Sequence, residues 1–136
     1  MTRFLAVISA DGTTIAVESY GTGPAVAIVG GASCDRSAGR ELAEALGGLG
    51  FTGITYDRRG RGDSGDTRPC AVEREVEDLA AVLAAYPGRA FAHGISSGSA
   101  IVLRALEAGV PSLRQAFSSR PTAARKRRCR PAMSPS

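Results

Sequence analysis

The chain has 136 residues, of which 43% are hydrophobic and 22% are charged, as in an ordinary globular domain. No apolar run approaches the ~18 residues that a membrane-spanning helix needs, and Asp11 and Gly12 interrupt the N-terminal segment too soon for a secretory signal. The composition therefore argues against a chain that is disordered throughout, predicts no contact with membranes, and makes the cytoplasm the expected compartment.

The formal net charge of +4 is unevenly distributed along the chain. Residues 118–136 contain six basic residues and no acid, so that residues 1–117 have 11 basic residues against 13 acidic ones. The basic character belongs to the C-terminal segment alone. We therefore expect no nucleic acid as a partner of the preceding domain.

Three cysteines, Cys34, Cys70 and Cys129, are an odd number, and their spacing matches neither a C-x-x-C pair nor a zinc site. The chain has only one histidine to assist them. We expect free thiols in a reducing compartment and no bound metal.

Two β-prone runs open the chain, at residues 3–9 and 13–20. Asp11-Gly12 separates them, and this dipeptide best tolerates the positive φ of a tight turn, so we expect an antiparallel hairpin. Residues 25–29 are then apolar without polar alternation, as expected for a strand of a parallel sheet that is covered on both faces.

Helices and strands alternate from there on. Leu42, Leu46 and Leu49 recur at helical spacing and predict an amphipathic helix over residues 40–49, of which they form the apolar stripe. Residues 51–57 are expected to form a strand, and residues 60–69 a glycine-rich loop.

A second amphipathic helix is predicted from Val72 to Tyr86, with Glu73, Arg74, Glu77 and Asp78 mostly off its apolar face. A short strand at residues 89–93 and a third helix ending at Gly109 follow. Strands that alternate with such helices imply right-handed βαβ crossovers. The predicted fold class is thus α/β with three layers, α/β/α, a mostly parallel sheet and an antiparallel N-terminal hairpin.

Gly94-Ile95-Ser96-Ser97-Gly98 fits the pattern G-x-S-x-G between a strand and a helix, which is the context of a nucleophile elbow. The turn is sharp and strained, and side chains two residues before and after the serine would collide with neighbouring backbone. The pattern predicts an exposed Oγ on Ser96, above the sheet.

Two further motifs stand in the expected order. The segment 57–65, Asp-Arg-Arg-Gly-Arg-Gly-Asp-Ser-Gly, looks like the D-x-R-G-x-G-x-S loop of the α/β-hydrolase family, and Gly30-Gly31-Ala32 stands where the H-G-x oxyanion loop of that family lies. Residues 11–110 resemble the N-terminal half of this family. Residues 60–65 also fit the dinucleotide pattern G-x-G-x-x-G, but no helix opens at Gly65, so we set nucleotide binding aside.

The resemblance implies acyl transfer. Ser96 would be the nucleophile, the backbone N–H groups of Ala32 and Ser97 would form the oxyanion hole, and Gly31 and Ile95 would contact a small acyl group. The dehalogenases and epoxide hydrolases of the family carry aspartate in place of this serine, which leaves ester, thioester or peptide-like bonds as substrates and requires no cofactor.

The partners that should activate the serine are missing. The family order is serine, acid, histidine, but only Glu107 and no histidine follow Ser96. Glu107 would lie roughly 15 Å away along a helix. His93 belongs to the strand before the turn and should point into the packing of the sheet. We therefore expect little turnover from this chain.

Residues 1–117 are predicted to form a partial hydrolase domain, and residues 118–136 a disordered basic tail rich in Arg, Pro and Ser. An out-of-frame ending of a truncated hydrolase is favoured over a native tail because the sheet stops in mid-element, with one edge of strand 89–93 unpaired. The alternative is a non-catalytic half-fold that binds a partner chain or itself through this edge, with the tail on anionic surfaces.

Overall fold

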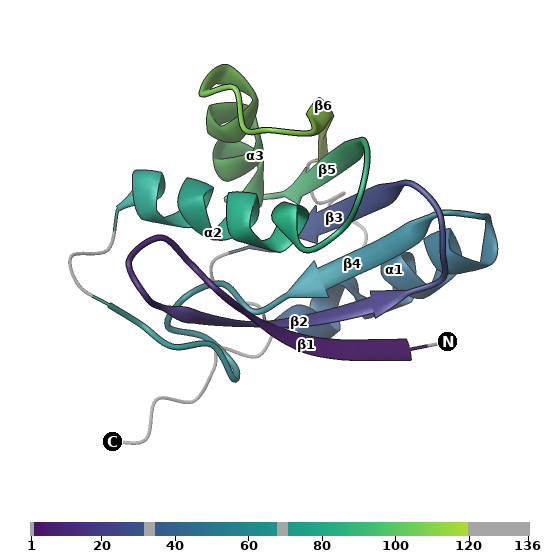
Figure 1. Cartoon of the computed structure of the whole chain (residues 1–136), viewed down its shortest axis with the longest axis horizontal. Helices are drawn as coiled ribbons and strands as arrows, with labels where there is room; N and C mark the ends of the chain where they lie inside the picture. The colour runs from purple at the N-terminus through teal and green to yellow at the C-terminus, as the bar shows by residue number, and fades with distance from the viewer. Residues whose placement is uncertain (1, 32–34, 68–70, 120–136) are drawn as a thin grey trace.

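The computed structural model describes residues 2–31, 35–67 and 71–119. They form one six-stranded sheet in the order β1-β2-β4-β3-β5-β6, with helices on both faces (Figure 1). The strands are β1 (Thr2–Ile8), β2 (Thr14–Tyr20), β3 (Ala25–Val29), β4 (Thr52–Tyr56), β5 (Ala90–Ile95) and β6 (Leu113–Ser119). The helices are α1 (Arg40–Gly48), which follows a 3-10 turn η1 (Arg36–Gly39), α2 (Val72–Ala84) and α3 (Gly98–Glu107).

The N-terminal hairpin is confirmed. β1 pairs antiparallel with β2, with Ile8 opposite Thr14 at the turn. Gly12 has a φ of +88°, and the Asp11 carboxylate accepts a hydrogen bond from the backbone N–H of Thr13 at 3.1 Å. Both residues thus act in the turn as the Asp-Gly dipeptide predicts.

The parallel core of the sheet is confirmed as well. β4, β3, β5 and β6 run parallel to their neighbours, while β2 pairs antiparallel with β4. Every residue of β4 is buried, and so are four of the five residues of β3. Burial on both faces follows from the helix layers, since α2 and α3 cover one face and α1 the other (Figure 1).

The buried side of α1 differs from the prediction. Leu42 is 40% exposed and Leu49, the C-cap, is 74% exposed, whereas Ala43 is the only buried residue of the helix. The reason is a close backbone approach, because a Cβ added to Gly53 of β4 would lie 2.0 Å from the carbonyl oxygen of Ala43. Only a small side chain fits at such a contact, so Ala43 faces the sheet and the leucines lie to the side.

The predicted unpaired edge of strand 89–93 was wrong, because β6 lies beside β5 along its whole length. Ser112, with a φ of +69°, turns the chain back toward β5, and its carbonyl oxygen accepts from the N–H of Ala90 at 2.9 Å. β6 extends to Ser119, two residues beyond the expected domain boundary. The rest of the predicted tail lies outside the described residues.

Candidate active site

The serine turn lies between β5 and α3. Ser96 has a φ of +55°, which is rare for a residue with a side chain and stores strain, and it is exposed. A Cβ added to Gly94 would lie 2.5 Å from the Cα of Ser99, and one added to Gly98 would lie 2.1 Å from the carbonyl oxygen of Val29. Both glycines are therefore required sterically, and the turn has the geometry that a nucleophile elbow needs.

The end of β3 lies directly against this turn, since Gly98 approaches the backbone of both Val29 and Gly30. Gly31 is buried, and Ile95 is partly exposed at the end of β5. Ala32, the other expected oxyanion donor, lies outside the described residues. Ser97 is the N-cap of α3, where backbone N–H groups lack acceptors within the helix. The structure thus brings Val29 and Gly30 to the serine turn, and the position of Gly31 relative to Ser96 stays a prediction.

Arg58 connects these two segments, and sequence reasoning gave it no role. Its Nη1 donates to the carbonyl oxygen of Gly30 at 3.2 Å and to the Oγ of Ser97 at 3.0 Å. Its Nε and Nη2 donate to the two carboxylate oxygens of Glu75 on α2, at 2.6 and 2.8 Å. The Arg58 side chain is only 7% exposed. One buried guanidinium therefore holds the end of β3, the start of α3 and helix α2 together.

Arg59 makes a similar bidentate contact with α2, to an acid one helical turn beyond Glu75. It donates to both carboxylate oxygens of Asp78, at 2.7 and 2.6 Å, and to Asp11 at 2.8 Å. The hydrogen bond from Arg59 holds the pKa of Asp11 well below its usual range. Asp78 was predicted to lie mostly off the packed face of α2, but it is 1% exposed. The sequence did contain a signal for these ion pairs: two consecutive arginines, Arg58 and Arg59, and two acids three residues apart on α2, Glu75 and Asp78.

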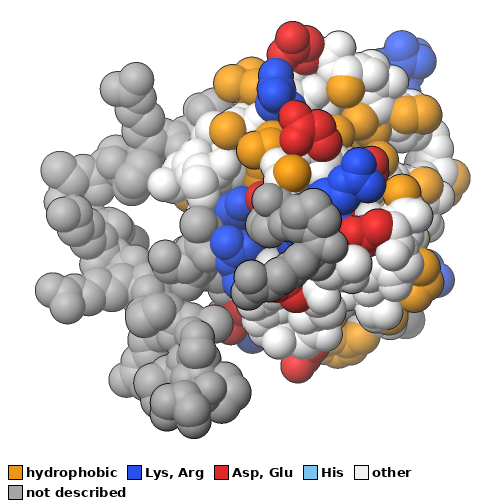
Figure 2. Space-filling view, turned by 90° about the vertical axis from the view of Figure 1, so that its left-hand side faces the viewer, with side chains coloured by type: hydrophobic (Ala, Val, Ile, Leu, Met, Phe, Trp, Pro, Cys, Tyr) orange, Lys and Arg blue, Asp and Glu red, His pale blue; other side chains and the backbone are white. Residues whose placement is uncertain are grey.

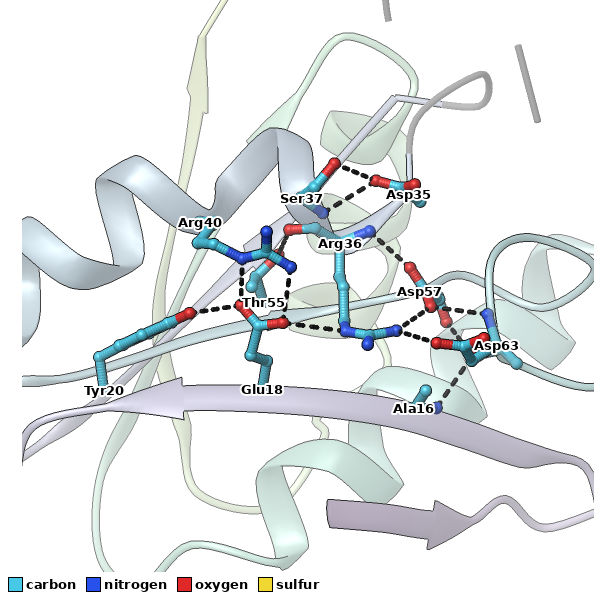
Figure 3. A network of polar contacts seen from close by, with 11 residues as sticks. Ala16, Glu18, Tyr20, Asp35, Arg36, Ser37, Arg40, Thr55, Asp57 and Asp63 are labelled. Carbon is cyan, nitrogen blue, oxygen red and sulfur yellow. Dashed lines mark hydrogen bonds and ion pairs between the residues drawn. The ribbon is translucent and has the colours of Figure 1, made fainter. Parts of the chain in front are cut away.

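Asp57 and Arg36 fix the other end of the segment that follows β3 (Figure 3). The Asp57 carboxylate is fully buried and accepts from the backbone N–H and the Nη1 of Arg36, both at 2.5 Å. It also accepts from the backbone N–H of Asp63 at 2.9 Å. The first residue of the D-x-R-G-x-G-x-S loop therefore holds the chain just after the expected oxyanion loop.

Glu18 extends this network to β2 and α1 (Figure 3). Its fully buried carboxylate accepts from Arg40 at 2.6 and 2.9 Å, from Arg36 at 3.0 Å and from the Tyr20 hydroxyl at 2.5 Å. The hydrogen bonds from Arg40 lower the pKa of Glu18 to about 2, although burial opposes this shift. Burial in turn raises the pKa of Tyr20.

The two candidate substitutes for a triad base or acid lie apart from the turn. Glu107 is the last residue of α3, whereas Ser96 precedes the first. His93 lies in β5 and lines a hollow of about 470 Å³ beside α1. The other side chains of this hollow are apolar: Val26, Ile28, Leu42, Leu46, Phe51 and Phe91.

One side of the molecule carries charged side chains of both signs. On the side of the molecule at the left of Figure 1, Figure 2 shows basic and acidic side chains interspersed.

In the part of the chain that the structure describes, no His, Cys, Asp and Glu side chains are grouped as metal ligands. No helix within residues 2–31, 35–67 and 71–119 is long and apolar enough to cross a membrane. The site is thus defined by a strained serine at the end of a parallel strand, in a three-layer α/β/α protein.

Comparison with known proteins gives the family. No protein-family model and no curated protein matches the chain. Among solved structures, an α/β hydrolase from Sphaerobacter thermophilus DSM 20745 is 54% identical, with a TM-score of 0.76 over 82% of this chain and 44% of that one. The bottromycin epimerase BotH, solved with bottromycin A2, is 34% identical, with a TM-score of 0.75 over 85% and 47% of the two chains.

A third solved structure shares the fold at a much lower sequence identity. The epoxide hydrolase VrEH1 of Vigna radiata is 19% identical, with a TM-score of 0.79 over 86% of this chain and 38% of that one. The 54% identical α/β hydrolase, together with the shared fold, places the chain in the α/β-hydrolase fold family. The chain spans less than half of the length of each of these three proteins, consistent with the N-terminal half of the fold.

Proposed function

We propose that this chain carries the nucleophile and the oxyanion hole of a serine hydrolase that acts on ester, thioester or peptide-like bonds. The observation that carries the proposal is the backbone of Ser96, a serine with a φ of +55° between two glycines that tolerate no side chain. Such strain persists where the surrounding structure enforces it, and it clusters at active sites. At this position it leaves the Ser96 side chain exposed.

In the proposed reaction, the Oγ of Ser96 attacks the carbonyl carbon and loses its proton to a base. The carbonyl oxygen becomes an oxyanion that accepts hydrogen bonds from the N–H groups of Ala32 and Ser97, each worth about 3 kcal/mol. The alcohol, thiol or amine then leaves with a proton, and water hydrolyses the acyl-enzyme. This sequence has no histidine after Ser96, so solvent hydroxide is the proposed base and turnover is slow.

The relatives by themselves do not select this chemistry, because one of them is named a hydrolase and another an epimerase. A covalent acyl adduct on Ser96 is the intermediate that the proposed hydrolase reaction requires. The cytoplasm is the proposed compartment, because the three cysteines follow no disulfide spacing.

The test is acylation of the full chain by p-nitrophenyl acetate, followed by release of p-nitrophenol and by intact mass. We expect one acetyl group per chain, located on Ser96 by peptide mapping and formed faster at higher pH. Ser96→Ala should abolish it. Ser112→Ala is the matched control, because Ser112 is the other described serine with a positive φ and lies away from the turn. Acetylation that persists in Ser96→Ala would refute the proposal.

The second candidate is a non-catalytic half-fold that binds another copy of this chain. It is favoured by the apolar hollow beside α1 and by β6, which is the edge strand of the described sheet. Light scattering tests it. A defined oligomer that persists when residues 120–136 are deleted would support pairing through the sheet, whereas a monomer would exclude it.

A further inference from the structure

The contacts of Arg58 reach the end of β3 and Ser97, one of the two donors of the proposed oxyanion hole. We propose that Arg58 is a positioning residue that sets where the N–H of Ser97 lies, by holding the Gly30 carbonyl and the Ser97 side chain in one place. This inference rests on the proposed function. It adds a role for a residue that acts through Gly30 and Ser97.

The donor geometry of Arg58 supports this role. A guanidinium has five N–H donors in a rigid plane. Nε and Nη2 bind the Glu75 carboxylate at 2.6 and 2.8 Å, which leaves both hydrogens of Nη1 for Gly30 and Ser97. Glu75 therefore fixes the plane of the guanidinium, and the plane fixes where the other two contacts lie.

On the β3 side, the contact controls the direction of a peptide plane. The carbonyl of Gly30 and the N–H of Gly31 belong to one planar peptide unit, so holding the oxygen fixes the plane of that unit at the end of β3. On the α3 side, the contact with the Ser97 Oγ holds the residue whose N–H is the second proposed donor. Arg58 thus connects the end of β3 to the residue that supplies one of the two expected donors.

Arg59 provides an internal control that separates positioning from stability. It is as deeply buried as Arg58 and binds its acid, Asp78, on the same helix in the same bidentate manner. Its other side-chain contacts are with Asp11 and the carbonyl of Thr67, and none of these residues belongs to the serine turn. A purely structural role for Arg58 would make the two arginines equivalent.

The experiment compares Arg58→Lys with Arg59→Lys in the full chain. Lysine keeps the charge, but its single nitrogen cannot bind a carboxylate through two atoms and reach Gly30 and Ser97 as well. The substrates are p-nitrophenyl acetate and its thiono analogue, in which sulfur replaces the carbonyl oxygen. Sulfur is a weak acceptor, so the ratio of the two acylation rates reports on the oxyanion hole itself.

We expect Arg58→Lys to slow acylation by the ester about 10- to 100-fold, as displacement of donors does, and to lower the ester-to-thionoester ratio about 10-fold. Arg59→Lys should leave the ratio at the parent value. Ser97→Ala, which removes one contact but spares the pair with Glu75, should lower the ratio by a smaller factor. An unchanged ratio in folded Arg58→Lys, or an equal fall in both arginine variants, would overturn the proposal.

Hydrogen exchange keeps this test separate from that of the proposed function. If the parent chain shows no acylation at Ser96, the proposed function fails, and exchange of the amides at residues 29–31 and 95–98 decides the role of Arg58. If Arg58 has the proposed positioning role, these amides should exchange faster in Arg58→Lys than in Arg59→Lys. Equal exchange in the two variants contradicts it.

Discussion

The two faces of the sheet differ in how much apolar packing they contain. On the α2 and α3 face, Leu79, Val82, Ile101 and Val102 are at most 1% exposed and form a continuous apolar core. On the α1 face, the helix buries only Ala43, a hollow stays open between helix and sheet, and the carboxylates of Glu18 and Asp57 bind arginines. Hydrophobic burial therefore dominates on the first face, which also carries the buried pairs Arg58–Glu75 and Arg59–Asp78, whereas the second face has charge pairs with little apolar packing beside them.

The largest expected difference between the faces is in leucine deletion. Leu79→Ala should lower the free energy of unfolding by roughly 3 to 4 kcal/mol, because Leu79 is fully buried and its removal leaves a cavity. Leu49→Ala, at the end of α1, should lower it by less than about 0.5 kcal/mol, because its side chain is 74% exposed. Urea unfolding measures both. Comparable losses would show that the α1 leucines are packed after all.

Charge deletion on the α2 side should have the next largest effect. Asp78→Ala removes the bidentate partner of the buried Arg59 and should cost roughly 3 kcal/mol, the low end for a broken buried pair, because Asp11 still contacts the guanidinium. Glu73→Ala is the matched control on the same helix. Its exposed pair with Arg104 should contribute less than about 0.5 kcal/mol. Thermal melts that rank the two variants equally would contradict this reading of α2.

A third comparison between the two faces is the pH dependence of stability on the α1 side. The pKa of Glu18 falls from 4.5 to about 2 on folding, so its contribution to stability is present above pH 4.5 and is lost as the pH falls toward 2. Glu18→Gln should be less stable than the parent chain at pH 7, and the difference should shrink between pH 4.5 and 2. Urea midpoints across this range measure it. A difference that stays constant with pH would exclude Glu18 as its source.

Local patterns predicted most of the elements. Asp11-Gly12 specified the hairpin, the apolar run at residues 25–29 specified a buried strand, and Gly94 and Gly98 specified the serine turn, because each signal lies within a few neighbouring residues. The order of strands and helices then gave the sheet. The same reasoning placed Ser96 on the turn, although its chemical role remains a prediction.

The features that the sequence did not predict depend on contacts between distant segments. The leucine stripe of α1 gave no sign that Gly53 draws Ala43 onto the sheet. β6 is short of apolar residues, so its pairing with β5 was not visible in its own composition. Arg58 acts through Glu75, 17 residues away, and through Gly30 and Ser97 on other elements. Only the folded chain brings these groups together.

The contacts at Gly30 and Arg36 also bear on how the chain opens locally. Arg58 fixes the first point and Asp57 the second, both from the loop that follows β4. Because two consecutive residues carry the two contacts, a disturbance of that loop reaches both points at once. The end of β3 and the start of η1 should therefore lose their contacts together in local unfolding.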